Sequence, residues 1–176
     1  MKTLTIILAA GKRNGDFAIP KMLMPVYGEP LLTRNVRLAR EHFGPDVVVA
    51  VSNPAIGATV DCTVMVTNRT GGSCDTMMDT ARFWPAYDRV QVSLADVFYS
   101  PSSMALMVTE TRPLVFYCDT QDTFAFQFRK EVFQLVERAG NQVVHHAHGR
   151  EKGAGLPHLW QWLSTGQHRP VKQQLR

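Results

Sequence analysis

The sequence predicts an α/β fold, a three-layer α/β/α sandwich built around a mainly parallel sheet. Short apolar runs, such as residues 4–8 and 46–51, have the composition of strands that are buried on both faces. Stretches with apolar residues at helical spacing, such as 31–39, alternate with these runs along the chain. Strands that alternate with helices indicate right-handed crossovers, so we expect helices on both faces of the sheet.

The composition is that of an ordinary folded protein of one domain, which we expect to span residues 1–176. The chain is 45% hydrophobic and 19% charged, values that argue against disorder. No apolar run approaches the roughly 18 residues that a membrane-spanning helix needs, and the first residues lead directly into a strand pattern, so we expect a cytoplasmic protein without a membrane partner. The net charge of +4 suits an anionic ligand and leaves nucleic acid neither indicated nor excluded.

The three cysteines give no sign of a disulfide or a metal site. Cys62, Cys74 and Cys118 have no close pairing and no metal-ligand spacing. We therefore expect three reduced thiols, as in a reducing compartment.

The segment from residue 3 to residue 32 predicts a loop that holds a nucleoside triphosphate. A buried strand runs into the small residues Ala9-Ala10-Gly11, and the cations Lys12 and Arg13 follow at once. Lys21 comes directly after Pro20, whose ring fixes φ and stiffens the loop. Glycine allows backbone N–H groups to approach phosphate oxygens, and the cations neutralise the remaining charge.

The order of residues in this segment resembles a known superfamily. The matching residues are Leu8-Ala9-Ala10-Gly11, Arg13, Pro20-Lys21, Leu23, Gly28 and Pro30-Leu31-Leu32. This pattern resembles the nucleotidyltransferases with a GT-A-like fold, which include sugar-1-phosphate nucleotidyltransferases and the molybdenum-cofactor guanylyltransferase. The resemblance implies a GT-A-like nucleotidyltransferase fold and an enzyme that uses a nucleoside triphosphate.

The remaining elements are predicted from apolar spacing and from stop signals. We expect further strands at 46–51, 62–67, 89–94, 113–118, 124–128 and 141–148. We expect a helix from Glu29-Pro30 to Gly44-Pro45, a helical turn at 53–57, and helices over 73–83 with Ser73 as the cap, from Pro101 to 108 or beyond, over 129–139 with Gly140 as the stop, and over 156–163. On the strand predicted at 141–148, His146 and His148 would share a face, as metal ligands sometimes do, although half-exposed polar surface is the commoner reading.

Asp96 is the candidate metal ligand. It follows the strand predicted at 89–94, and an acidic residue at the carboxyl end of such a strand points into the crevice where ligands bind. Ser100-Pro101 is a better cap and first-turn pair for the next helix, which leaves Asp96 for a metal. The resemblance implies that the Asp96 carboxylate binds the catalytic Mg²⁺ and that the loop 71–73 contacts the nucleobase.

The resemblance implies a magnesium-dependent transfer of a nucleoside monophosphate from a triphosphate to a phosphorylated small-molecule acceptor, with release of pyrophosphate. Catalysis would rest on Arg13, Lys21 and Asp96, with Gly11 as a backbone donor. Relatives often bring a second acid from a late segment, but this chain has no Asp after Asp122, and only His148, His158 or His168 could substitute. The residues predicted to bind the nucleotide are Leu8, Ala9, Ala10, Gly11, Lys12, Gly71, Gly72 and Ser73.

Two other functions fit the same pattern. A GT-A-type glycosyltransferase that uses a nucleotide-sugar can share a metal between a strand-end acid and a later histidine. A catalytically silent nucleotide-binding protein is compatible with the absence of a second acid. The sequence leaves the base, the acceptor and the oligomeric state open.

Overall fold

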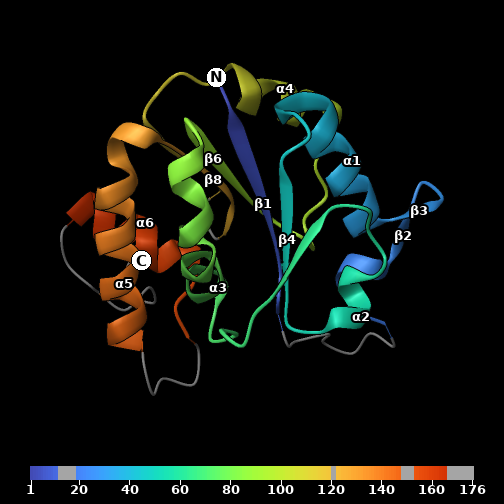
Figure 1. The fold of residues 1–176 in the computed structure, drawn as a ribbon, viewed down its shortest axis with the longest axis horizontal. Coiled ribbons are helices and arrows are strands. Elements are labelled where there is room, and N and C mark those ends of the chain that lie inside the picture. Colours follow the sequence, from blue (N-terminus) through green and yellow to red (C-terminus); the bar gives the residue numbers. More distant parts are fainter. Residues whose placement is uncertain (12–18, 120–121, 148–152, 166–176) are drawn as a thin grey trace.

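The computed structural model describes residues 1–11, 19–119, 122–147 and 153–165, and its centre is a six-stranded sheet in the order β5-β4-β1-β6-β8-β7 (Figure 1). The strands β5, β4, β1 and β6 are parallel, whereas β8 runs antiparallel to both β6 and β7. The sheet is therefore mainly parallel, as the sequence predicts. The strand bounds are Thr3–Ala9 (β1), Val47–Val51 (β4), Thr63–Val66 (β5), Arg89–Leu94 (β6), Leu114–Cys118 (β7) and Thr123–Arg129 (β8).

Helices cover both faces of the sheet, which confirms the three-layer architecture. Helices α3 (Ser73–Asp79), α5 (Phe133–Ala147) and α6 (Leu156–Thr165) lie on one side of β1, and α1 (Leu31–Phe43) lies on the other (Figure 1). The strand β1 divides its apolar side chains between these layers. Leu4 and Ile6 belong to the core cluster that contains residues of α3, α5 and α6, whereas Ile7 packs with residues of α1. Helix α4 (Pro101–Thr109) packs against α1, and α2 (Pro54–Gly57) is a single short turn.

A tight hairpin directly precedes α1. A short 3-10 helix, Lys21–Leu23, leads into β2 (Pro25–Val26) and β3 (Glu29–Pro30). Tyr27 and Gly28 form its two-residue turn with φ values of 51° and 84°, the positive pair that a type I′ turn requires. The predicted helix start at Glu29-Pro30 is therefore slightly early, because both residues belong to the hairpin and Pro30 precedes the first helical residue.

The strand predicted at 141–148 is wrong, because α5 continues as a helix to Ala147. Gly140 does not end this helix. A Cβ at Gly140 would collide with the Met78 sulfur, so the glycine allows α5 to lie close to α3. The buried side of α5 repeats every three or four residues, at Val136, Ala139 and Val143, which is a helical period.

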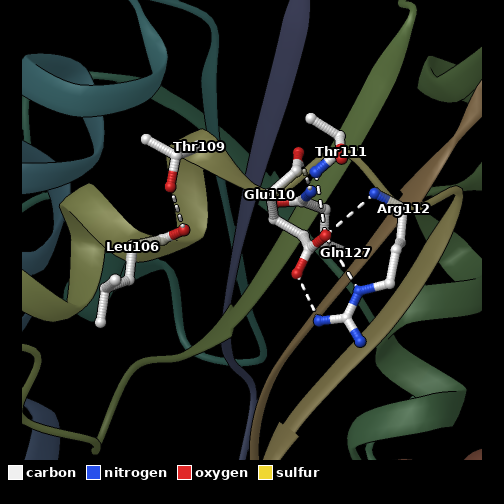
Figure 2. A network of polar contacts seen from close by, with 6 residues as sticks. All are labelled: Leu106, Thr109, Glu110, Thr111, Arg112 and Gln127. Carbon is white, nitrogen blue, oxygen red and sulfur yellow. Dashed lines mark hydrogen bonds and ion pairs between the residues drawn. The ribbon is translucent and has the colours of Figure 1, made fainter.

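A network of polar contacts stabilises the connection between α4 and β7 (Figure 2). The Glu110 carboxylate accepts hydrogen bonds from the backbone N–H groups of Thr111 and Arg112, each 2.9 Å long, and from the Arg112 guanidinium. Gln127 of β8 donates to the Glu110 carbonyl oxygen over 3.5 Å. The side chain of Glu110 thus holds the backbone in the bend that leads into the edge strand β7.

The other predicted elements are confirmed to within a few residues. The helix predicted over 73–83 is divided, because α3 ends at Asp79 and a 3-10 helix, Ala81–Ala86, follows it.

All three cysteines are free thiols, and burial raises the pKa of Cys74 to about 12. No helix in the described part of the chain is long and apolar enough to cross a membrane.

Candidate active site

The carboxyl ends of β1 and β6 border a pocket of about 230 Å³. These strands are parallel neighbours with Leu8 paired to Leu94, so their last residues open at the same edge of the sheet. Lys21 and Asp96, the cation and the acid that the sequence singles out, both line this pocket. The lining residues are Leu8, Ala10, Gly11, Lys21, Met22, Thr70, Gly72, Ser73, Thr76, Leu94 and Asp96.

The end of β1 supplies one wall. Leu8, Ala10 and Gly11 line the pocket, whereas Ala9 alternates to the opposite face and packs in the α1 layer. A Cβ at Gly11 would meet no described atom within 4 Å, and its φ is outside the left-handed region. Neither crowding by the described protein atoms nor backbone strain requires glycine here. Lys12 and Arg13 lie outside the described residues.

The position of Lys21 follows from the short helix that it begins. The N–H of Leu23 donates to the Pro20 carbonyl over 2.8 Å, which closes the turn behind the proline. Met22 is buried and packs in the core cluster that contains Leu32 of α1. The buried Met22 anchors the turn, and the exposed Lys21 faces the pocket.

Asp96 is the exposed residue of the tight turn after β6. Ala95 before it is completely buried and donates its N–H to the Leu8 carbonyl over 3.0 Å, so the turn starts in register with β1. Ser100 caps α4 by accepting a hydrogen bond from the Ser103 N–H. The expectation that Asp96 is not the cap of this helix is therefore confirmed.

The loop before α3 supplies the opposite wall. Gly72 and Ser73 line the pocket, but Gly71 faces a different hollow and donates its N–H to the Asp75 carboxylate over 3.2 Å. The prediction that Ser73 caps α3 is wrong, because Gly72 holds the cap position. The Ser73 hydroxyl instead accepts a hydrogen bond from the Leu156 N–H at 2.9 Å, a contact between segments far apart in the sequence.

The first turn of α3 is already occupied by the protein itself. The Ala154 carbonyl accepts hydrogen bonds from the N–H groups of Cys74 at 2.8 Å and Asp75 at 3.4 Å. A Cβ at Gly72 would collide with the backbone of Ala154, so this close approach requires glycine. Consequently these two amides are not donors for a phosphate, although helix N-termini often provide such donors.

Four further pocket residues were not found by sequence reasoning. Met22, Thr70, Thr76 and Leu94 all line the pocket. Leu94 pairs directly with Leu8, and Thr76 follows Ser73 by almost one helical turn, so both could have been found from the predicted strand pairing and helix period. The Thr76 hydroxyl donates to the Arg69 carbonyl over 2.8 Å and fixes the approach of the loop to α3.

The residues at this edge are compatible with a magnesium ion held by one carboxylate. Among the described residues, no group of three or more His, Cys, Asp or Glu could hold a metal. Mg²⁺ is usually bound through one or two carboxylates, with phosphate oxygens and waters as the other ligands, so Asp96 beside a triphosphate fits its chemistry. His158 uses Nδ1 to accept a hydrogen bond from the Gly155 N–H, and His148 and His168 lie outside the described part of the chain.

An apolar groove of about 560 Å³ begins at the residues that directly follow Asp96. Val97, Phe98 and Tyr99 contribute to one side of it, and the ends of β7 and β8 contribute Tyr117 and Phe124. The same sheet edge therefore carries the pocket with Lys21 and Asp96 at β1 and β6 and an apolar groove beside it.

Comparison with known proteins agrees with this arrangement. The model of the MobA-like NTP transferase domain matches residues 5–165, and the chain belongs to this family. It is a nucleotidyltransferase with a GT-A-like fold, which confirms the fold and the class of enzyme that the sequence indicates. A search of curated proteins found no match.

Solved structures show the same fold at low sequence identity. The inositol-1-phosphate CTP transferase from T. maritima has a TM-score of 0.66 at 14% identity, over 96% of this chain and 83% of its own. Rv0371c from Mycobacterium tuberculosis H37Rv, in complex with manganese, has a TM-score of 0.63 at 18% identity, over 96% and 85%. CTP:phosphocholine cytidylyltransferase from Streptococcus pneumoniae has a TM-score of 0.56 at 12% identity, over 83% and 79%.

Proposed function

We propose that the protein is a magnesium-dependent nucleotidyltransferase that moves a nucleoside monophosphate from a triphosphate to a phosphorylated small molecule and releases pyrophosphate. One observation carries this proposal. Lys21 and Asp96, from distant parts of the chain, line the same pocket at the carboxyl edge of β1 and β6. A cation and an acid that can hold a metal ion, placed around one site, can stabilise the charge that develops in phosphate transfer.

The roles follow from the charges and from the open space. Lys21, together with Arg13, neutralises the phosphates, and Gly11 brings a backbone donor close to them. Asp96 would hold Mg²⁺, which when bound neutralises charge on the phosphate oxygens, and a manganese complex of the neighbour Rv0371c supports a divalent metal. Gly72 and Ser73 lie on the opposite wall of the pocket, and this position supports the proposal that they contact the nucleobase. Catalysis then rests on positioning and electrostatics.

The acceptor is proposed to be a small molecule that carries a phosphate group. The names of two structural neighbours specify such acceptors, inositol-1-phosphate and phosphocholine. The groove of about 560 Å³ after Asp96 supports an approach of the acceptor from the side of β7 and β8.

The experiment measures binding first and turnover second. Thermal shifts with the four ribonucleoside triphosphates, with and without Mg²⁺, identify the nucleotide, because a ligand of the folded state raises the melting temperature. Pyrophosphate release is then measured with inositol-1-phosphate, phosphocholine and sugar 1-phosphates as acceptors.

Asp96→Asn is expected to abolish the Mg²⁺-dependent part of the shift and to lower turnover by about 100-fold. Lys21→Ala is expected to weaken triphosphate binding by about tenfold, the effect of one lost charged hydrogen bond.

Two variants control for charge alone. Asp61→Asn and Lys130→Ala each remove a side-chain charge outside the pocket, so both are expected to behave as the parent protein. A full Mg²⁺-dependent shift in Asp96→Asn would rule out the proposed metal ligand. Binding without turnover for all acceptors would favour a silent nucleotide-binding protein, and release of nucleoside diphosphate from a nucleotide-sugar would favour sugar transfer.

A further inference from the structure

The backbone on both sides of Asp96 is held by a single buried side chain. Asn35 lies in the second turn of α1 and is only 1% exposed. Its Nδ2 donates to the Ala95 carbonyl at 3.3 Å and to the Val97 carbonyl at 3.0 Å. These carbonyls belong to the residues directly before and after Asp96, so one amide spans the turn that presents the carboxylate.

The contacts of Asn35 are directed at this turn. Both hydrogens of Nδ2 are used there, while Oδ1 is buried and accepts no hydrogen bond from the part of the chain that the structure describes. Asparagine is a poor residue for a helix interior, and a buried acceptor without a partner lowers the stability of the fold. An apolar side chain would suit both the helix and the core better. The advantage of asparagine therefore lies in its two hydrogen bonds to the turn that carries Asp96.

Arg34, the residue before Asn35 in α1, holds the next part of the segment that follows Asp96. Its guanidinium donates to the Tyr99 carbonyl at 2.6 Å and lies over the Phe98 ring at 4.3 Å. The Tyr99 hydroxyl in turn donates to the Phe124 carbonyl at 2.6 Å and accepts from the Leu94 N–H at 3.1 Å. The whole segment from the end of β6 to the start of α4 is thus tied to its neighbours.

Helix α1 also holds the segment that carries Lys21. The N–H of Leu31, its first residue, donates to the Met24 carbonyl over 3.0 Å, and Leu32 packs in the same core cluster as Met22. The first turn of α1 therefore supports the cation, and the second turn supports the acid.

We propose that Asn35 is a positioning residue that fixes the direction of the Asp96 carboxylate relative to Lys21, with α1 as the common support. This inference rests on the metal role proposed for Asp96. A partner behind a metal ligand typically changes metal affinity by 10–100-fold when it is removed, because the ligand then has to be oriented on binding.

The test compares Asn35→Leu, which removes both donors at similar volume, with Thr80→Val as a matched control. Thr80 is fully buried, its hydroxyl forms hydrogen bonds with Met77 and Trp84, and it lies on the other side of the sheet from α1. Loss of this hydroxyl should therefore destabilise the protein without changing a residue that lines the pocket. Mn²⁺ affinity is measured by electron paramagnetic resonance with α,β-methylene CTP and then α,β-methylene GTP as the bound nucleotide. Binding of each analogue in EDTA is measured separately.

We expect Asn35→Leu to weaken Mn²⁺ binding by about tenfold, while affinity for the analogue in EDTA changes less than twofold. Thr80→Val is expected to lower the melting temperature and leave Mn²⁺ affinity unchanged. If Asn35→Leu does not fold, Asn35→Ala replaces it with the same expectation.

Parental Mn²⁺ affinity in the folded Asn35 variant, together with loss of Mn²⁺ affinity in Asp96→Asn, would overturn the positioning role of Asn35 and leave the proposed metal site intact. Parental affinity in Asp96→Asn as well would overturn the proposed function itself.

Discussion

At the level of single residues, Gly11 contributes only backbone to the wall of the pocket. The described protein leaves its Cβ position open, so Gly11→Ala should fold as well as the parent protein, with a change in the free energy of unfolding below about 1 kcal/mol. The added methyl group would stand where we place the phosphates. We therefore expect the affinity for the triphosphate to fall by about tenfold, or about 1.4 kcal/mol.

Isothermal titration of the nucleotide and urea unfolding measure these two quantities separately. Unchanged affinity in a folded Gly11→Ala variant would show that the phosphates do not approach this backbone.

Glu110 makes the stability depend on pH in the acid range. Hydrogen bonds from Arg112 lower the pKa of its carboxyl from 4.5 to about 2 (Figure 2). Because the pKa is lower in the folded protein, the stabilisation is present above pH 4.5 and is lost as the pH falls toward 2. Arg112→Gln should raise this pKa toward 4.5 and make the free energy of unfolding less dependent on pH in that window.

Urea unfolding at several pH values between about 2 and 7 checks the slope, with Arg82→Gln as the control. An identical slope in Arg112→Gln and the parent protein would contradict the assignment.

Local chemistry is enough to single out Lys21 and Asp96, through their charge and their positions after a proline and after a strand. The structure places both in the lining of one pocket, and their roles stay predictions. Ser73 was misread because its hydroxyl bonds to Leu156, a partner that no local pattern indicates.

At the scale of elements, the packing of α5 on α3 depends on Gly140. Gly140→Val would place two methyl groups against Met78, and overpacking of this kind costs about 1–3 kcal/mol of stability. In a double-mutant cycle, Met78→Ala should offset part of this cost, because the two side chains compete for the same space.

Thermal or urea unfolding of the four proteins measures the coupling. Strict additivity of the two changes would indicate that α5 and α3 can separate to accept the valine.

Elements were predictable where the sequence period and the flanking residues agree. The run that forms β4 is wholly apolar and the run that forms β1 is mostly apolar, whereas apolar and polar residues alternate in β6, so the strand identity of all three follows from their pattern. The C-terminal half of α5 was misread as a strand because Gly140 resembles a stop signal. The sequence around a glycine does not show whether it ends a helix or lets another helix approach.

At the scale of the whole molecule, the segment before α6 supports the loop that leads into α3. Gly72 lies against the Ala154 backbone, and Ala154 in turn occupies the first amides of α3. Gly72→Ala should displace this contact, lower the melting temperature and weaken triphosphate binding by at least threefold, about 0.7 kcal/mol.

Gly57→Ala is the matched control, because its Cβ would collide with Val64, outside the pocket. It should lower stability and leave nucleotide binding unchanged. Equal effects of both substitutions on binding would assign the Gly72 effect to stability alone.

By itself, the sequence determined the class of the fold, because this depends on the periodicity of short segments, and it indicated the enzyme family through the resemblance of residues 3–32 to known nucleotidyltransferases. Only the tertiary structure decided which residues meet. It brought Lys21 and Asp96 to one pocket, turned Gly71 away from it, assigned the first amides of α3 to Ala154 and placed Asn35 behind the Asp96 turn. These contacts join segments that are distant along the chain, and sheet order and helix packing bring them together.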